Sequence, residues 1–468
     1  MKLRVFLSLC VMAVVACAWS AQPIAQNRQI GINVVLNTDI TPAIVADLSA
    51  HGLILNNYQA IDVVTMRVAQ GELAAIQAKP YVAAANPDAE RNGAPVDTVD
   101  ATDFGTGSNT WNLDAVNVTN FGSTARQVAQ DGRGVYVAVI DTGLLDSWRQ
   151  YFPEQRIATQ YAIAFSGGGG EVGNVSTVPN QWEHDQNSHG THVTSTILGF
   201  NMGTRVVNGV APLATVIPIK VLGQNGSGWS SRTAAAIVYV TNLARGPLAG
   251  SPVVINMSLG GPDLDAAEKA AIDYAVANGV VVVASAGNEG EAGMGYPGAY
   301  EPVIAVAASG WTGEWTPDSA WWRTKDVAEP TRARDFYITD FSSREKPGQD
   351  LDVAAPGSWV VGPYQTQSGN ASYYFLGGTS MASPHVAGIA ALMLQKNPTL
   401  GQAEVDRILE QTAIPLSAGC RDIVDPDRGP IQICWGADAT GAGLTTADAA
   451  VAATSSSTSI ATTKNRTK

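Results

Sequence analysis

Three short stretches of the chain carry an acid, an imidazole and a hydroxyl in settings that suit acyl transfer. Asp141 ends an apolar run, His189 is followed by glycine, and Ser380 follows a Gly-Gly-Thr sequence at the start of a predicted helix. An aspartate at the end of a buried strand can hold an imidazole in one tautomer and stabilise its cation. A serine at a helix N-terminus lies among free N–H groups, which favour developing negative charge. Together the three side chains supply an orienting acid, a base and a nucleophile.

Each of these residues also has a simpler interpretation. An aspartate after a strand is commonly a turn or cap residue, and a serine at this place is commonly an N-cap. His189 and His192 lie on one helix face as two metal ligands would, but no Glu lies between them and no third ligand is evident. The occurrence of all three stretches in one chain favours the catalytic interpretation, with no metal in the chemistry.

From Val135 onward, apolar runs alternate with amphipathic helices. The runs cover residues 135–140, 215–222, 252–257, 279–284 and 302–307. Continuous hydrophobicity is typical of parallel strands that are buried on both faces, and the predicted helices 233–244 and 265–277 would cover them. The pattern predicts a doubly wound α/β domain with a mostly parallel sheet flanked by helices. Asp141, Ser258 and Asn288 follow the carboxyl ends of strands, where sites gather in such folds.

The three stretches, in the order Asp, His, Ser, resemble those of the subtilase family of serine peptidases, and the resemblance runs from about Trp111 to Ala452. It implies a catalytic triad of Asp141, His189 and Ser380. It also implies that Asn288, in the sequence Ala-Gly-Asn-Glu-Gly, donates a hydrogen bond to the oxyanion.

The same resemblance implies two edges of a substrate cleft, along which an extended peptide pairs as an added strand. Residues 222–228 form one edge and residues 255–260 the other. The implied substrate-binding residues are Gly226, Ser227, Gly228, Ser258, Leu259, Gly260, Gly287 and Gly295. Gly287 and Gly295 would line the pocket for the residue before the scissile bond. Two glycines leave room there for a large apolar or aromatic side chain, and Glu289 would disfavour an acidic one.

The N-terminus predicts export. Lys2 and Arg4 precede an apolar run, Val5–Ala18, that suits a signal peptide over residues 1–20, with cleavage before Ala21. The alternative is a lipoprotein box at Val14–Cys17, which would leave Cys17 lipidated. We therefore expect a secreted protein, with lipid anchoring through Cys17 as the alternative. No later stretch is long and apolar enough to span a bilayer.

Residues 21–94 read as strand, helix, strand, helix, strand. In order and position this unit resembles the inhibitory prodomain of subtilases, a small ferredoxin-like α+β module. In the family it assists folding and then blocks the cleft until it is cut away; the alternative is a permanent N-terminal domain. We expect residues 95–110 to form an exposed linker that contains the maturation site. We expect residues 111–455 to form the peptidase domain, and residues 456–468 a disordered Ser/Thr-rich tail.

Three further features lie within the predicted peptidase domain. Cys420 and Cys434 are close in sequence in an exported protein and are expected to pair, with two free thiols as the alternative. The usual calcium site of the family looks doubtful, because the loop after Asp141 contains Trp148 and Arg149 besides Asp146, and the loop 200–208 contains Arg205. No cofactor is expected for the chemistry. Residues 311–340, rich in Trp, charges and Pro, predict a surface insertion.

The net charge of the chain limits the kinds of molecule that it is expected to bind. The 468 residues carry a formal net charge of −13, with an isoelectric point near 4.8, which argues against binding nucleic acid. We expect protein or peptide substrates, the chain's own prodomain as an intramolecular inhibitor, and a monomer. Two other functions use the same motifs: an ester-preferring acyl hydrolase and a catalytically inactive secreted binding module. The cleft edges argue against the first, and the complete triad with Asn288 argues against the second.

Overall fold

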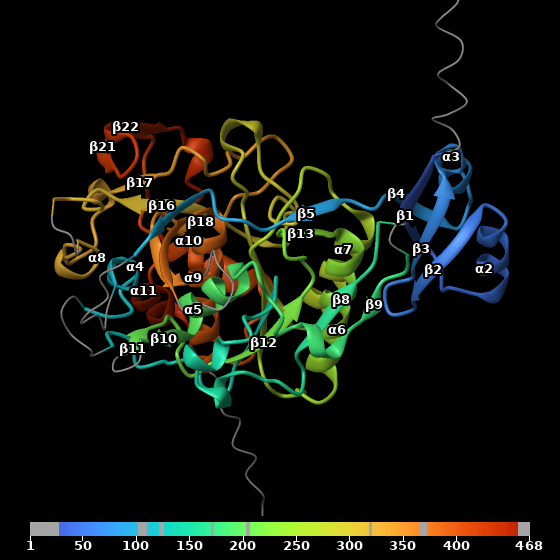
Figure 1. The fold of residues 1–468 in the computed structure, drawn as a ribbon, viewed down its shortest axis with the longest axis horizontal. Coiled ribbons are helices and arrows are strands. Elements are labelled where there is room, and N and C mark those ends of the chain that lie inside the picture. The colour runs from blue at the N-terminus through green and yellow to red at the C-terminus, as the bar shows by residue number, and fades with distance from the viewer. Residues whose placement is uncertain are drawn as a thin grey trace, which may run out of the picture.

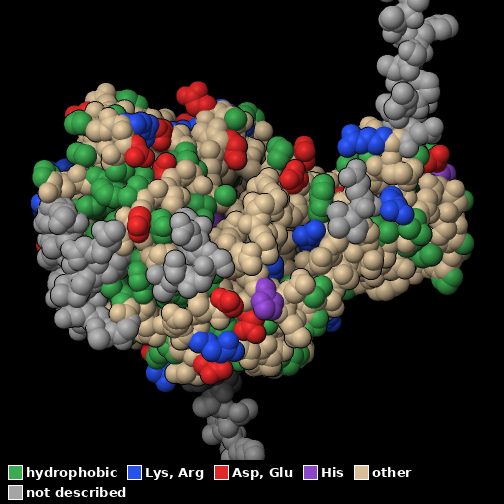
Figure 2. Space-filling view, in the orientation of Figure 1, with side chains coloured by type: hydrophobic (Ala, Val, Ile, Leu, Met, Phe, Trp, Pro, Cys, Tyr) green, Lys and Arg blue, Asp and Glu red, His purple; other side chains and the backbone are tan. Residues whose placement is uncertain are grey.

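A small N-terminal unit is attached to one side of a large α/β body (Figure 1). The computed structural model describes residues 28–101, 110–120, 126–169, 173–202, 206–317, 321–364 and 372–456. The predicted signal peptide and the predicted tail from residue 457 lie outside these ranges. The space-filling view shows the N-terminal unit as a separate lobe that protrudes from the larger one (Figure 2).

The N-terminal unit is a four-stranded antiparallel sheet in the order β2-β3-β1-β4. Its elements are β1 (Gln29–Leu36), α2 (Pro42–Ser49), β2 (Gly52–Tyr58), β3 (Val63–Ala69), α3 (Leu73–Gln77) and β4 (Val82–Pro87). Val34, Leu48 and Met66 lie fully buried in its own small core. The sequence did not predict β2, which contains Asn56 and Asn57 and is only half-buried, so its hydrophobic pattern is weak.

The large body is built on a nine-stranded sheet in the order β17-β16-β15-β14-β7-β12-β8-β9, with β18 also paired to β16. Its strands are β7 (Tyr136–Asp141), β8 (Ile163–Ser166), β9 (Ser176–Thr177), β12 (Thr215–Lys220), β14 (Val253–Met257), β15 (Val281–Ser285), β16 (Ile304–Trp311), β17 (Phe336–Ile338) and β18 (Val353–Pro356). Every pairing is parallel except β8 with β9 and β16 with β17. The predicted mostly parallel sheet is confirmed.

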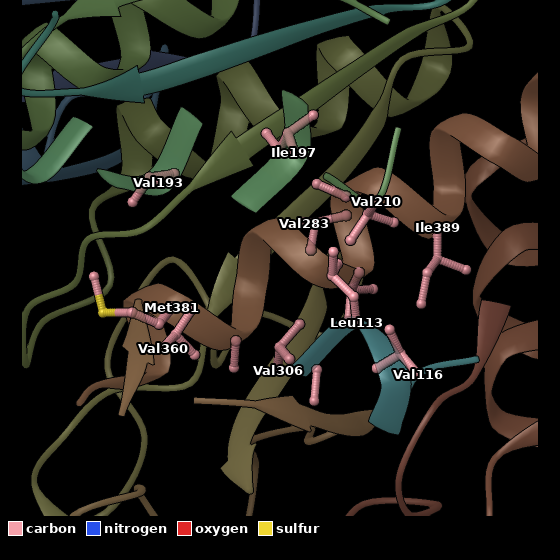
Figure 3. Packing of buried hydrophobic residues seen from close by; sticks show 14 of the residues in the cluster. Leu113, Val116, Val193, Ile197, Val210, Val283, Val306, Val360, Met381 and Ile389 are labelled. Carbon is pink, nitrogen blue, oxygen red and sulfur yellow. The ribbon is translucent and has the colours of Figure 1, made fainter. Parts of the chain in front are cut away.

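Helices cover both faces of this sheet. One face carries α5 (His189–Leu198), α9 (Thr379–Lys396), α10 (Gln402–Thr412) and α11 (Ala447–Ala453), and the other carries α6 (Ser230–Arg245) and α7 (Ala266–Ala277). A separate hydrophobic core lies on each face of the sheet, and successive residues of a strand point into one core and then the other. Val139 packs toward α9, and Ile140 packs toward α6. Helix α9 is buried along almost its whole length, with Met381 and Ile389 among aliphatic side chains of α5, β15 and β16 (Figure 3).

Smaller elements complete the body. They are β5 (Glu90–Asn92), β6 (Asp97–Asp100), α4 (Trp111–Ala115), β10 (Gly199–Asn201), β11 (Val206–Asn208), β13 (Ser227–Trp229), α8 (Trp321–Thr324), β19 (Val360–Pro363), β20 (Tyr373–Gly377), β21 (Gly419–Asp425) and β22 (Gly429–Trp435). The hairpin β21–β22 holds Cys420 opposite Cys434, and a disulfide of 2.05 Å joins them. The expected pairing of these cysteines is confirmed.

The Trp-rich segment 311–340 is not the surface insertion that its composition suggested. Trp311, Trp321 and Trp322 are buried, and β17 extends the main sheet. Trp111 stacks on Trp311 at 6.3 Å between ring centroids, although the two residues lie far apart in the sequence. The charges and prolines around these tryptophans made the segment look exposed in the sequence, although it forms part of the core.

Glu314 is buried within this aromatic cluster. Its carboxylate accepts hydrogen bonds from the hydroxyls of Tyr337 and Ser358, at 2.7 and 2.9 Å, and from the backbone N–H of Trp311. Burial raises the pKa of Glu314 to about 8, even though these hydrogen bonds lower it. The group therefore favours its protonated form within the fold.

The predicted linker differs from expectation where the structure describes it. Strand β5 pairs with β13, and β6 pairs with β20, so both flanks of Ala94 are held by backbone hydrogen bonds. Several of the residues remain exposed, as expected, but the backbone is not free. Residues 102–109 lie outside the described ranges. Within the part of the chain that is described, no helix is both long and apolar enough to cross a bilayer.

Candidate active site

Asp141 and His189 form a buried pair at the carboxyl edge of the sheet. Asp141 is the last residue of the central strand β7, and His189 is the first residue of α5. The His189 Nδ1 atom lies 2.8 and 3.0 Å from the two carboxylate oxygens of Asp141, and neither side chain is exposed. This geometry orients the imidazole and presents Nε2 to the opposite side.

A second buried carboxylate positions the turn that carries His189. Ser188 has a positive φ of 75°. Asp185 holds this turn by accepting the N–H groups of Asn187 and Ser188, and it also accepts the hydroxyl of Thr142 at 2.9 Å. Thr142 Oγ1 in turn accepts the N–H of Gly190 at 2.8 Å. Asp185 therefore links the loop after β7 to the start of α5.

The sequence did not single out this role of Asp185. Burial raises the pKa of Asp185 to about 6, while the nearby ammonium of Lys220 lowers it. Gly190 allows a close approach of two backbone segments, because a Cβ there would clash with the carbonyl oxygen of Gly143. The only available sequence signal for Asp185 was its position shortly before the histidine.

Ser380 occupies the first turn of α9, where backbone N–H groups have no acceptor within the helix. Its hydroxyl donates to the carbonyl oxygen of Ser258 at 3.3 Å, and the hydroxyl of Ser258 donates to the carbonyl of Ser380 at 2.8 Å. His189 Nε2 is buried and has no hydrogen-bond partner in the described part of the chain. The expected bond between Ser380 and His189 thus requires the hydroxyl to leave Ser258.

Asn288 is fixed beside Ser380 with its amide nitrogen available. The Oδ1 atom accepts the backbone N–H of Thr379 at 2.9 Å and its hydroxyl at 2.8 Å. Because a backbone N–H can only donate, the accepting atom must be the oxygen, which assigns Nδ2 to the other direction. A Cβ on Gly378 would lie 3.8 Å from this Nδ2 atom, so the amide nitrogen lies close to the backbone just before the nucleophile.

The two predicted cleft edges are strands that already hold a third segment between them. Ser227 pairs with Asn92 in the antiparallel contact of β13 with β5. On the other edge, Asn92 and Gly260 exchange two backbone hydrogen bonds of 2.9 Å. The chain around Asn92 therefore lies where the sequence expected an extended peptide.

This segment continues across the nucleophile. The N–H of Gly93 donates to the carbonyl of Gly226 at 2.9 Å, and the N–H of Val96 donates to the carbonyl of Gly377 at 2.7 Å. A Cβ on Gly93 would lie 3.5 Å from Cε1 of His189. Ala94 and Pro95 therefore pass over Ser380, which is only 3% exposed.

The predicted specificity pocket is narrow at its glycines. A Cβ on Gly287 would lie 2.5 Å from Glu289 Oε2 and 2.9 Å from Ser343 Oγ, so this glycine permits a close approach of side chains. Gly295 lies against the backbone of Gly260 and Gly261, whose atoms would be 3.5 to 3.8 Å from a Cβ at this position. The preference for a large apolar residue stays a prediction.

The remaining histidines of this region are held by hydrogen bonds away from the reacting atoms. His192 Nε2 bonds the carbonyl of Val360, and the two ring nitrogens of His385 lie 2.8 Å from Met381 O and Asn112 Nδ2. Burial lowers the pKa of His192 to about 3 and that of His385 to about 4. Both rings are therefore neutral structural groups.

One group of carboxylates among the described residues is close enough to share an ion. Asp352, Asp406 and Glu410 have ligand atoms that lie within 4.8 Å of one another. Burial raises the pKa of Asp352 to about 9, and its Oδ2 accepts the N–H of Ala305. Asp352 thus favours its protonated form. Asp146 is described, but Arg205 of the doubtful calcium site lies outside the described ranges.

The fold and the polar residues at its carboxyl edge define a hydrolase on a doubly wound α/β scaffold. Residues 132–459 match the model of the subtilase family. Subtilisin DY of Bacillus licheniformis is 38% identical over 289 residues, which cover 61% of this chain and 85% of that protein. A thermostable alkaline protease of Halalkalibacterium halodurans is 29% identical over 417 residues, covering 89% of this chain and 96% of the relative.

Solved structures agree on the fold. Fervidolysin from Fervidobacterium pennivorans, a keratinolytic enzyme related to subtilisin, aligns with a TM-score of 0.64 at 24% identity, covering 91% of this chain and 61% of that one. Sphericase aligns with a TM-score of 0.53 at 28% identity, covering 72% of this chain and 97% of its own. The chain therefore belongs to the subtilase family. Its class is that of the serine endopeptidases, which hydrolyse peptide bonds.

Proposed function

We propose that this chain is a secreted serine endopeptidase that is made as an inactive precursor and acts through Asp141, His189 and Ser380. The buried contact of 2.8 Å between Asp141 and His189, beside a serine at the N-terminus of α9, carries the proposal. Residues 1–20 would direct export. The alternative, a lipid anchor on Cys17, is distinguished by the mass of the exported N-terminus.

In the first step, the Ser380 hydroxyl turns from the carbonyl of Ser258 toward His189 Nε2. Its oxygen attacks the substrate carbonyl carbon while Nε2 takes the proton, and Asp141 stabilises the resulting imidazolium. The carbonyl oxygen becomes an anion, and the amide of Asn288 and the N–H of Ser380 donate hydrogen bonds to it. These donors favour the transition state because they are fixed before the charge develops.

The intermediate then collapses. The C–N bond breaks, and His189 gives its proton to the leaving nitrogen, so that one product departs as an amine. The other product stays as an ester on Ser380. Water attacks this ester with His189 again as the base, and the second product departs as a carboxylic acid. The chemistry needs no cofactor.

The N-terminal unit would act as the inhibitor, a prodomain of the ferredoxin-like kind. Its segment from β5 to β6 fills the cleft, and polar side chains hold its sheet against two helices. Asp88 accepts the N–H of Ser231 at 2.9 Å at the start of α6. Asn86 donates to Asp265 and accepts the N–H of Ala266 at the start of α7. Maturation would require a cut between residues 94 and 110.

A substrate would take the place of this segment. Its backbone would pair with Ser227 and Gly228 on one edge and with Ser258 to Gly260 on the other, as an added strand. Protein and peptide segments in an extended conformation are the substrates that such a cleft fits. The side chain before the scissile bond would enter the space near Gly287 and Gly295, with the preference for large apolar residues given above.

The test is Ser380→Ala, compared with Ser383→Ala. Ser383 lies on the same helix and is fully buried, and its hydroxyl donates to Asn256 at 2.7 Å. Ser380→Ala should lose turnover by about 10⁶-fold, the scale of triad removal in subtilisin, together with labelling by a fluorophosphonate. Ser383→Ala should keep both.

Peptidase activity in Ser380→Ala would refute the assignment of the nucleophile. A processed wild-type protein, freed of the N-terminal unit, that resists labelling would instead support the inactive binding module. Rapid ester cleavage without peptide cleavage would support the acyl hydrolase.

A further inference from the structure

Arg91 is a fully buried arginine that lies inside the larger lobe, although it belongs to the segment after the N-terminal unit. Its Nε lies 3.1 and 3.2 Å from the two carboxylate oxygens of Glu268, and its Nη2 lies 2.6 Å from Oε2. Nη2 also donates to the carbonyl of Asp263, and Nη1 to that of Glu90. Neither Arg91 nor Glu268 has any exposed side-chain surface. The guanidinium is therefore enclosed and satisfied.

The backbone of Arg91 lies in the register of a bound peptide. Arg91 pairs opposite Gly228, and the next residue, Asn92, is bonded to Gly260 on the other edge. Gly93 then lies beside the ring of His189, since a Cβ on it would be 3.5 Å from Cε1, and Ala94 passes over Ser380. Arg91 is thus the third residue upstream of Ala94, and its side chain occupies a subsite of the cleft.

The walls of this subsite belong to the larger lobe and remain when the N-terminal segment leaves. Glu268 lies in the first turn of α7, and Asp263 precedes that helix. Burial raises the pKa of Glu268, and the charge and hydrogen bonds of Arg91 lower it again. An aliphatic side chain in this place would cover the carboxylate without compensating its charge, which is costly.

The shape of the contact favours arginine over lysine. A guanidinium presents Nε and Nη2 to both oxygens of one carboxylate while a further N–H reaches the carbonyl of Asp263. An ammonium has one nitrogen and cannot span these acceptors. An uncharged isostere such as citrulline keeps much of the shape but loses the charge.

We propose that the pocket formed by Glu268 and the carbonyl of Asp263 selects an arginine side chain in protein substrates, at the residue that pairs opposite Gly228. The inference rests on the proposed function, because it treats residues 90–94 as a guide to how substrates bind. The chain would then be a peptidase with an acidic subsite remote from the scissile bond.

The experiment uses the active enzyme that the full chain yields. Peptides carry the sequence of residues 88–94 followed by Ser-Val, with Arg, Lys, citrulline, Leu or Glu at the position of Arg91. Mass spectrometry identifies the bond cut, and kcat/KM is measured for each peptide. We expect the arginine peptide to exceed the citrulline peptide by about 30-fold, with lysine between them and glutamate lowest.

Variants assign the selection to Glu268. In Glu268→Gln the ratio of arginine to citrulline should fall to about threefold or less. Glu268→Asp keeps the charge on a shorter side chain. Its ratio of arginine to citrulline rates should lie between that of the wild type and that of Glu268→Gln. Glu404→Gln, an exposed position on α10, removes the same charge and should leave the ratio unchanged.

Equal rates on arginine and citrulline peptides in the wild type would overturn this inference and leave the proposed function standing. A ratio that persists in Glu268→Gln would also overturn it, because another group would then be responsible. Hydrolysis of none of the peptides would count against the proposed function itself. The wild-type peptide series decides the question even when a variant fails to fold.

Discussion

The contact between the two lobes and the interior around α9 use different kinds of interaction. Asn86, Asp88 and Arg91 attach the N-terminal segment through hydrogen bonds and one buried ion pair, supported by a few apolar residues such as Val63. Helix α9 is enclosed by aliphatic side chains on several sides (Figure 3). Polar contacts depend on geometry and are replaced by water when they part, whereas apolar burial opposes any exposure. In the maturation proposed above, the contact between the lobes would separate and is mainly polar, whereas the packing around α9 would stay and is apolar.

The largest expected effect in this comparison concerns the active site beside α9. Asn288→Leu should lower kcat by about 10²–10³-fold with little change in KM, because it removes a fixed donor to the oxyanion. Steady-state kinetics and the melting temperature should be measured together. Asn288→Asp should also be poor, because a carboxylate repels the oxyanion. A change in KM alone, or a loss of activity explained by unfolding, would contradict the assignment.

Next in size is the buried carboxyl of Glu314. Its pKa is raised, so the fold binds a proton that the unfolded chain releases between about pH 4.5 and 8. The stabilisation from this group is full below pH 4.5 and is lost as the pH rises through about 8. Glu314→Gln stays neutral, so its free energy of unfolding should fall by about 3 kcal/mol less than that of the wild type between pH 6 and 9.

Denaturant unfolding at both pH values measures this difference. Glu404→Gln, which is exposed, is the control and should follow the wild type. Parallel pH profiles for the wild type and Glu314→Gln would show that Glu314 is ionised in the fold.

The disulfide should contribute less than the carboxyl. Joining Cys420 to Cys434 closes a loop of about 15 residues, which stabilises by about 3 kcal/mol on the chain-entropy model. The strands β21 and β22 are already paired on both sides of the bond, so we expect about 2 kcal/mol for the double variant Cys420→Ala, Cys434→Ala. Two free thiols in the mass of the unreduced protein would contradict the pairing.

The smallest expected effect tests the contact between the N-terminal segment and the larger lobe. A Cβ on Gly93 would lie 2.7 Å from Leu222 and 2.9 Å from the carbonyl oxygen of Ser258, so Gly93→Ala should push the segment from the cleft. Uncut Gly93→Ala precursor should hydrolyse a small chromogenic substrate about tenfold faster than uncut wild type.

Gly401→Ala is the matched control, because a Cβ there has no neighbour within 4 Å. An uncut wild-type precursor that is already fully active would contradict the inhibitor assignment. Equal leakage from both precursors would show instead that Gly93 does not hold the segment.

The sequence predicted the parts of the molecule that depend on local pattern. Continuous apolar runs predicted β7, β12, β14, β15 and β16, since strands buried on both faces leave that signal. The order of the motifs around Asp141, His189 and Ser380, through the resemblance to subtilases, also predicted that these three residues act together.

The missed features are those that join distant segments. Arg91 and Glu268 lie 177 residues apart, and neither has a local pattern that suggests a partner. Asp185 acts through Thr142 and Ser188, and the buried tryptophans of segment 311–340 pack on Trp111. Charged and aromatic residues in a polar stretch look exposed until the fold supplies their neighbours.

Residues 90–100 are anchored on both sides of Ser380. Cutting the chain within this segment would therefore not by itself open the cleft. Strand β5 is held by β13 and Gly260 on one side, and β6 is held by β20 on the other. Hydrolysis of a bond between them would leave two ends, each still paired along its own strand. In the proposed maturation, the delay before activity appears would then depend on how long the cut strands stay bound, which is set by a dissociation rate and not by the rate of hydrolysis.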